Sequence, residues 1–276
     1  MADIAEQQVQ AGISDQCVDA RLQSCLGALE TGAATAEVLR PGMVLLRQVL
    51  PKSVQETLAS AAFRRGENGE TEGQGASGFK CWWVEEMSQH HQEGTQALDS
   101  AVTKRKLNVA KKNAGRIYDS VRSFPCGVTL ELLACHLLDV ARAADPALAR
   151  IPRITPTHLQ LWNYQPKKGV RIGWHRDDWW SDGEGDYPVL SLSVGASCMF
   201  LYKLEDHESA QSITLESGDA LIFGGPCRYI LHSVKRIHGT QSAPEWLQHP
   251  HPLCGGRLNF TFRYAPAAIG REAEYR

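Results

Sequence analysis

The sequence predicts an α+β fold in which N-terminal helices pack on one face of a double-stranded β-helix, or jelly roll. Two features of the chain support this prediction. From Thr157 onward, short apolar runs of strand length follow one another, separated by turn residues. Before Thr157, the apolar side chains also recur at helical spacing, which indicates helices that cover the sheet.

The composition limits the class of protein. The chain has 276 residues, 43% of them hydrophobic and 22% charged, which is enough to bury one sizeable core. The net charge of -2 excludes a chain that is basic throughout, so binding to nucleic acid would require a local basic patch. The longest apolar runs are too short to cross a bilayer, and the first residues lack a secretory signal.

The cysteines indicate the redox compartment. None of the eight cysteines forms a Cys-x-x-Cys pair, and a chain of this length does not need disulfides to fold. We therefore expect reduced thiols and a location in the cytoplasm, the nucleus or both. The protein is also expected to be a monomer and to have no membrane partner.

Two helices and one strand are predicted between residues 42 and 143. Gly42–Leu50 is rich in apolar residues and is predicted to form a strand. Pro51 follows it and opens a helix that is expected to end near Ala62. Leu130–Ala143 has apolar side chains on one helical face, so this helix is expected to pack on a sheet.

Two stretches of the N-terminal half lack a regular pattern. Residues 1–37 are polar and are predicted to be a partly disordered extension, with a short helix over residues 18–29. Arg64–Gly78 contains five glycines and is predicted to be a flexible loop. Trp82 and Trp83 follow that loop, so they either anchor it to the core or belong to a lid over a binding site.

One dense basic cluster lies between these stretches and the second helix. It consists of Lys104, Arg105, Lys106, Lys111, Lys112 and Arg116. Such a run is most often a solvated face, and the alternatives are contact with a phosphate backbone or a nuclear-import signal.

The C-terminal half is predicted to contain eight strands and no helix, except within an insertion at residues 235–256. Each candidate strand is a short extended run bounded by turn residues. The candidates are His158–Tyr164, Val170–His175, Pro188–Gly195, Cys198–Leu204, Ser212–Glu216, Ala220–Phe223, Tyr229–Val234 and Arg257–Tyr264.

Three residues on these strands have the chemistry of metal ligands. His175 and Asp177 stand two positions apart, so in an extended chain they face the same side. His232 follows a Gly-Asp turn and an apolar strand, and the return of a jelly roll would bring it across from His175. Two imidazoles and one carboxylate on one face of a metal leave three positions open, which suits Fe(II) and oxygen activation.

The last strand places charge inside the predicted barrel. Alternation puts Arg257, Asn259, Thr261 and Arg263 on one face and apolar side chains on the other. Buried arginines are costly unless anions pair with them, and guanidinium binds carboxylate in a bidentate manner. A small dicarboxylate bound at the metal would be such an anion, although an exposed sheet face is the simpler alternative.

These stretches resemble the AlkB family of Fe(II)- and 2-oxoglutarate-dependent dioxygenases. The likeness covers roughly residues 38–266 and is weaker before residue 157. Its most diagnostic part is the Arg-x-Asn-x-Thr-x-Arg strand after the second histidine. The stretches that carry it are Leu161–Pro166 with His175–Asp177, Pro188–Gly195, Leu215–His232 and Arg257–Arg263.

The resemblance implies roles for individual residues. His175, Asp177 and His232 would be the iron ligands, and the iron centre would need no separate protein acid or base. Arg257 would bind the distal carboxylate of 2-oxoglutarate. The residues that would assist it are Tyr164, Asn163, Asn259 and, nearer the metal, Arg263. The family usually has asparagine two residues before the tyrosine, where this chain has Trp162.

The resemblance also implies a division of the chain and a place for the substrate. Residues 38–156 would include a nucleotide-recognition lid, residues 157–266 the jelly-roll core, and residues 267–276 a tail. Bacterial members place an acidic residue four positions after the first histidine, where this chain has Trp179. The candidate substrate contacts are Trp82, Trp83, Asp178, Trp179 and Trp180. His249 and His251, in the insertion, are expected on a surface loop.

The implied activity is oxidative demethylation of N-alkylated nucleobases in DNA or RNA. It would use Fe(II), 2-oxoglutarate and O2, and would release formaldehyde and succinate. One alternative keeps this chemistry and changes the substrate to a protein side chain or a small molecule. Another is a non-catalytic jelly-roll binding module, which would not need the ligand triad or the two arginines.

Overall fold

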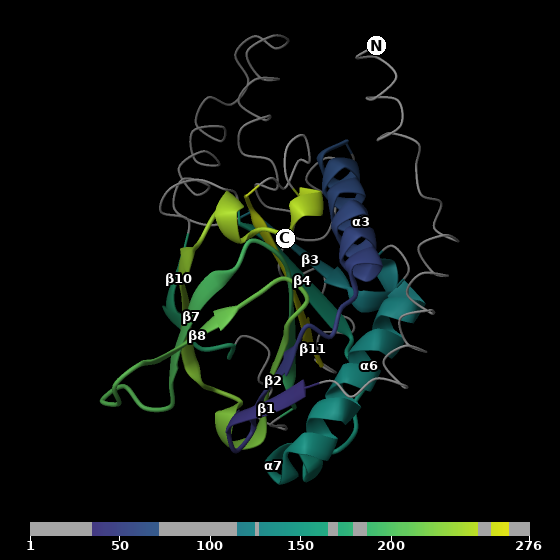
Figure 1. Ribbon diagram of the computed structural model, residues 1–276. Coiled ribbons are helices and arrows are strands. Elements are labelled where there is room, and N and C mark those ends of the chain that lie inside the picture. The colour runs from purple at the N-terminus through teal and green to yellow at the C-terminus, as the bar shows by residue number, and fades with distance from the viewer. Residues whose placement is uncertain are drawn as a thin grey trace, which may run out of the picture.

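Two antiparallel sheets form the framework of the protein. The computed structural model describes residues 35–71, 115–124, 127–164, 171–178, 187–247 and 255–264. The large sheet has the strand order β1-β2-β9-β6-β11-β4-β3, and the small sheet has the order β5-β10-β7-β8 (Figure 1). The large sheet consists of β1 (Thr35–Arg40), β2 (Met43–Arg47), β3 (Gly115–Ser120), β4 (His158–Tyr164), β6 (Val189–Gly195), β9 (Ala220–Phe223) and β11 (Arg257–Arg263). The small sheet consists of β5 (Ile172–His175), β7 (Cys198–Lys203), β8 (Gln211–Leu215) and β10 (Leu231–Ile237).

Helices cover one face of the large sheet. In Figure 1, α3 (Lys52–Thr71) and α6 (Gly127–Ala144) lie on the side away from β7, β8 and β10. Leu58 of α3 and Leu133 of α6 belong to the same buried cluster as Phe260 of β11. Their burial removes apolar surface from water, which is the main favourable contribution to packing a helix on a sheet. The prediction of a jelly roll with helices on one face is therefore confirmed.

A second apolar cluster fills part of the space between the two sheets. Met43 and Phe223 contribute to it from the large sheet, and Phe200 and Val234 from the small sheet. Residues along the strands of the large sheet alternate between this inner space and the cluster under the helices, as expected for strands whose successive side chains point to opposite faces.

Short helical segments connect several strands. They are α7 (Pro146–Ala149) and the 3-10 turns η2 (Val121–Ser123), η3 (Gly225–Cys227), η4 (Thr240–Ser242) and η5 (Glu245–Leu247). The last two lie in the predicted insertion at residues 235–256, whose first residues continue β10. Among the described residues, no helix is long and apolar enough to cross a membrane.

The structure corrects several predicted boundaries. The first helix continues to Thr71, so the loop predicted from Arg64 begins as helix. Once a helix is nucleated, each added residue gains a backbone hydrogen bond, so a helix can continue through residues that lack an apolar period. The strand predicted from Tyr229 begins at Leu231, because η3 and the turn after it occupy residues 225–229.

Two edge strands were not predicted from the sequence. β1 pairs with β2, and β3, which contains Arg116 of the basic cluster, pairs with β4. Both strands lie at an edge of the large sheet, where backbone pairing does not demand strict alternation. The other members of the basic cluster and the predicted helix over residues 18–29 lie outside the described residues.

Candidate metal centre and its cavity

His175 and His232 are brought together by strand pairing. They are directly opposite each other in the antiparallel pair β5·β10, and their ring centroids are 4.2 Å apart. The next pair along these strands is Ile172 with Val234. Two residues of β5 separate the pairs but only one residue of β10, so β5 bulges here. Such a bulge re-aims side chains beside a site. Here His175 and Ile172 both line the cavity, whereas Trp174 is 44% exposed.

Backbone carbonyls orient both imidazole rings. Nδ1 of His175 lies 2.9 Å from the carbonyl oxygen of Gly173, and Nδ1 of His232 lies 3.0 Å from that of Ile230. A carbonyl oxygen can only accept a hydrogen bond, so each Nδ1 carries the hydrogen when the ring is neutral. Each Nε2 is then left with a lone pair, as a metal ligand requires.

Asp177 completes the cluster. Its Oδ1 lies 3.8 Å from Nε2 of His175 and 4.0 Å from Nε2 of His232. Ligand atoms of the three residues lie within 4.8 Å of one another. Two neutral imidazoles and one carboxylate on one side of a cavity can hold an iron ion with positions left open.

The charges at this site suit a metal ion. Burial is the largest single influence on Asp177 and would raise its pKa, but the charge and hydrogen bond of Arg263, whose Nη2 lies 2.7 Å from Oδ2, together with the two histidines outweigh burial. The pKa of Asp177 is therefore well below its usual range. Burial also lowers the pKa of His232 to about 4. At neutral pH the site thus offers an ionised carboxylate and a neutral imidazole.

The three residues line a cavity of about 240 Å³ between the two sheets. Polar side chains from β4, β6 and β11 form one wall, and mainly apolar side chains form the rest. The other lining residues are Gln160, Trp162, Tyr164, Ile172, Ser191, Phe200, Leu215, Phe223, Val234, Arg257, Asn259, Thr261 and Arg263.

The guanidinium of Arg257 has hydrogen-bond donors without an acceptor among the described residues. The residue is 1% exposed, and its Nη2 donates to Oγ of Ser193 at 2.8 Å. Its Nε and Nη1 are buried and have no hydrogen-bond partner in the described part of the chain. Tyr164 is its neighbour across β4·β11, and burial raises the pKa of this phenol, which stays neutral. A carboxylate bound here would satisfy the guanidinium, so the residues fit one end of a dicarboxylate.

The other polar residues of β11 make hydrogen bonds within the protein, although Nε of Arg263 is buried without a partner in the described part of the chain. Asn259 Nδ2 donates to Oγ of Ser191 at 2.7 Å, and Thr261 Oγ1 donates to Oδ1 of Asn259 at 2.8 Å. Arg263 Nη1 donates to Oε1 of Gln160 at 2.6 Å. These bonds hold the wall of the cavity in one arrangement before any ligand binds.

The structure gathers most of the predicted site residues but not all of them. The three metal-ligand candidates lie together, and Tyr164, Arg257, Asn259 and Arg263 line the same cavity. Asn163 does not, because it pairs with Leu258 on the opposite face of β4. Trp162 takes the cavity side instead, stacked on Tyr164 with ring centroids 6.2 Å apart.

None of the predicted substrate contacts is found in the cavity lining of the described residues. Asp178 is exposed and is not part of the cavity lining. The other residues of this group, together with the two histidines of the insertion, lie outside the described residues; they are Trp82, Trp83, Trp179, Trp180, His249 and His251.

The polar residues of β4 and β6 were not predicted from the sequence as part of the site. Gln160, Ser191 and Ser193 each stand between apolar residues on their strands and face the polar side of β11. Their alternation, in Leu-Gln-Leu and Leu-Ser-Leu-Ser, was a usable signal for a polar inner face.

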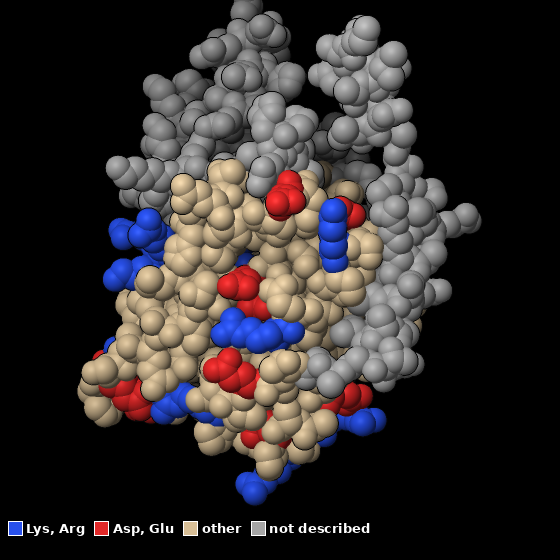
Figure 2. Space-filling view, viewed as in Figure 1, with Lys and Arg blue, Asp and Glu red and all other residues tan. Residues whose placement is uncertain are grey.

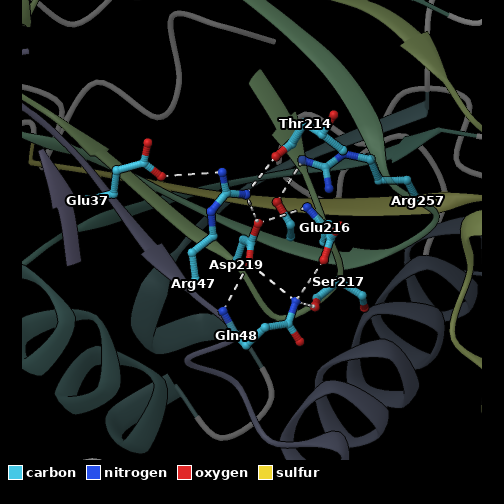
Figure 3. Close-up of polar contacts among 9 residues, drawn as sticks. Glu37, Arg47, Gln48, Thr214, Glu216, Ser217, Asp219 and Arg257 are labelled. Carbon is cyan, nitrogen blue, oxygen red and sulfur yellow. Dashed lines mark hydrogen bonds and ion pairs between the residues drawn. The ribbon is translucent and has the colours of Figure 1, made fainter. Parts of the chain in front are cut away.

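A polar network around Asp219 fixes the turn between β8 and β9 (Figure 3). The fully buried carboxylate accepts a hydrogen bond from Arg47 Nη1 at 3.1 Å. It also accepts bonds from the main-chain N–H groups of Gln48 at 3.0 Å and Glu216 at 2.9 Å. The same figure includes Arg257, for which no ion pair is found among the described residues. The Gly-Asp turn of the sequence is therefore a structural anchor.

Comparisons with known proteins agree with this geometry. The family model described as 2OG-Fe(II) oxygenase superfamily matches residues 42–263. "DNA N(6)-methyladenine demethylase ALKBH1D" of Arabidopsis thaliana is 31% identical over 259 residues, which are 89% of this chain and 56% of that protein. "tRNA demethylase abh1" of Schizosaccharomyces pombe is 31% identical over 106 residues, which are 36% of this chain and 33% of that protein. Both relatives are thus longer than the part that this chain spans.

A solved structure shows the same fold. The structure titled "The structure of OsALKBH1" superposes with a TM-score of 0.58 and 24% sequence identity. The match covers 83% of this chain and 99% of that chain. The likeness therefore concerns the fold over most of this chain.

Proposed function

The chain belongs to the 2OG-Fe(II) oxygenase superfamily, whose model spans residues 42–263, and from this premise we propose that it demethylates N-alkylated nucleobases in DNA or RNA. One observation carries the proposal. A cluster of two histidines and one aspartate shares a cavity with Arg257, whose buried donors suit a carboxylate.

The relatives support a nucleic-acid substrate. One is named as a demethylase of N(6)-methyladenine in DNA and another as a demethylase of tRNA. The chain spans 56% of the first of these relatives and 33% of the second, so their substrates come to this protein as a proposal.

The overall reaction balances without a protein acid or base. An N-methyl group, 2-oxoglutarate and O2 give the N–H group, formaldehyde, succinate and CO2. One oxygen atom enters succinate, and the other leaves in formaldehyde after hydroxylation of the methyl carbon. Bound Fe(II) together with 2-oxoglutarate supplies the oxidising chemistry.

The protein holds and orients the reactants. Nε2 of His175, Nε2 of His232 and Oδ1 of Asp177 would bind the metal. Arg257 would bind the distal carboxylate of 2-oxoglutarate through Nε and Nη1, with the Tyr164 hydroxyl beside it.

The remaining residues keep these groups in place and keep the cavity dry. Arg263 holds Asp177 ionised and in position. Phe200, Phe223 and Val234 form an apolar wall of the cavity, which would limit the access of water to the reacting atoms.

A methylated base in a duplex must leave the stack to enter this cavity. The face over β1, β2 and β8 is an unsuitable track for the phosphate backbone. Figure 2 shows acidic and basic side chains interleaved there, and the ion pairs Arg40–Glu208 and Arg47–Glu37 account for part of this pattern. We therefore place the nucleic acid on another face of the protein. We further propose a monomer that acts in the cytoplasm, the nucleus or both.

The test is a demethylation assay with defined substrates. Purified protein is incubated with Fe(II), 2-oxoglutarate and oligonucleotides that carry N6-methyladenine or N1-methyladenine, in DNA and in RNA. The expected result is formaldehyde and succinate in equal amounts, with loss of 14 mass units per base, roughly one CH2. A His175→Ala variant should be inactive.

A hydroxylase of a protein or small molecule is the second candidate, which the net charge of -2 favours. Succinate production with every methylated oligonucleotide intact would support this candidate against demethylation of nucleobases. Absence of both metal binding and 2-oxoglutarate binding would instead indicate a binding module.

A further inference from the structure

One short segment before β10 contacts metal-ligand candidates or their neighbours on two different parts of the chain. It consists of Arg228, Tyr229 and Ile230. Nη1 of Arg228 donates to the main-chain oxygen of Asp177 at 2.6 Å. The Tyr229 oxygen accepts from Nη1 of Arg176, 2.5 Å away. The Ile230 oxygen accepts from Nδ1 of His232, as described above. One short segment thus touches the ligand loop after β5 and the ligand on β10.

We propose that Arg228 is a positioning residue of the metal centre, which holds Asp177 at the distance and orientation that metal binding requires. This inference rests on the proposed metal site and is independent of the substrate. Asp177 lies two residues beyond the end of β5, so strand pairing no longer fixes its backbone. The bond from Arg228 supplies that constraint.

The environment of Arg228 makes this bond strong. The residue is 4% exposed, and its guanidinium lies 5.0 Å from the centre of the Tyr229 ring. Guanidinium remains charged when buried, and a charged donor makes a shorter and stronger hydrogen bond than a neutral donor. The planar group and the ring below it leave the side chain little freedom to follow a displaced carbonyl.

Asp177 is consequently held at both ends. Arg228 binds its main-chain oxygen, and Arg263 binds Oδ2 of its side chain. Oδ1 is left facing the Nε2 atoms of the two histidines. Removing one of the two restraints should allow Oδ1 to move and weaken the metal site without removing a ligand.

The test measures the metal affinity of the 276-residue chain. Mn²⁺ and Co²⁺ are titrated into metal-free wild type and Arg228→Gln by calorimetry. We expect Arg228→Gln to bind both ions about 10- to 100-fold more weakly, as is common when a group that orients a metal ligand is removed. The visible absorption of bound Co²⁺ should also change, because it depends on coordination geometry.

Arg142 offers a matched control. It also donates to main-chain oxygens, those of Leu148 and Ala149, but it lies on α6, away from the cavity. Arg142→Gln should destabilise the fold and leave the Mn²⁺ and Co²⁺ affinities within about twofold of wild type, because it touches no ligand.

Each outcome decides the proposal. A folded Arg228→Gln that binds both ions as wild type does, with an unchanged Co²⁺ spectrum, overturns it. If Arg228→Gln does not fold, Arg228→Met replaces it, because methionine fills similar space without a donor; wild-type affinity in that variant likewise overturns the proposal. Wild type that binds neither ion would contradict the proposed metal site itself, which separates the two failures.

Discussion

Arg263 Nη2 lies 2.7 Å from Oδ2 of Asp177, so the carboxylate that faces two imidazoles with one oxygen is bound to an arginine through the other. Both side chains are less than a tenth exposed, and Arg263 also donates to Gln160. The ion pair therefore connects β11 with the ligand loop after β5.

Replacing Arg263 by glutamine should raise the pKa of Asp177. The expected consequence is weaker metal binding that declines further as the pH falls, since burial then favours the protonated carboxyl. Breaking a buried pair costs about 3–5 kcal/mol, so a large loss of unfolding free energy is also expected. Denaturant unfolding and Mn²⁺ titration between pH 5 and about 8 measure both effects. Arg122→Gln, which breaks an exposed pair with Glu131, serves as the control and should leave metal binding unchanged.

Replacing Arg257 by methionine should separate cosubstrate binding from folding. Loss of a charged hydrogen-bond donor costs about 1.5–3 kcal/mol, which corresponds to roughly 10- to 100-fold weaker 2-oxoglutarate binding. The free protein should not lose stability to the same degree, because the variant removes a buried cation with unused donors. Calorimetry of the Mn²⁺-loaded protein with 2-oxoglutarate tests this. Unchanged 2-oxoglutarate affinity would remove Arg257 from the proposed site.

Acid should destabilise the metal-free protein in a defined window. The pKa of His232 is about 4 in the folded protein and 6.5 when unfolded, so the unfolded state binds more protons between these values. Unfolding free energy should therefore fall as the pH drops from 6.5 to 4, by at most about 3 kcal/mol from this residue. Asp177, whose pKa is lowered, adds a further loss below pH 3.8. Urea unfolding across this range measures the slope, and His232→Gln should flatten it above pH 4.

Trp162 and Asn163 should behave differently when replaced. Trp162→Ala removes a side chain from the cavity wall and its contact with Tyr164, so the affinity for 2-oxoglutarate should change. Asn163→Ala should leave that affinity unchanged and destabilise the fold by about 1–3 kcal/mol, because this amide is fully buried on the other face of β4. The same calorimetric titration compares the two variants. A loss of cosubstrate binding in Asn163→Ala alone would reverse the assignment.

Much of the candidate site follows from local pattern. The spacing of His175 and Asp177 and the alternation along Arg257–Arg263 place these side chains on one face of their strands, because strand residues alternate sides. The same rule explains the error at Asn163. It stands next to Tyr164 in the chain, so it had to face the other way, and only Trp162 could share the cavity with Tyr164.

Other features could not be predicted from local pattern. β1 and β3 join the large sheet at its edges through backbone hydrogen bonds, which any sequence can supply. The contact of Arg228 with the Asp177 main chain joins residues 51 positions apart, and nothing near either residue marks it.

The sequence by itself determined the fold class, the ligand types and the face on which each strand carries its polar residues. Those properties depend on periodicity and side-chain chemistry, which are local. The sequence also predicted His232 across from His175, but tertiary structure alone decided that Arg263 pairs with Asp177 and that Arg257 keeps unused donors. Partners across strands depend on the register and order of the sheets, and these result from the packing of the whole chain.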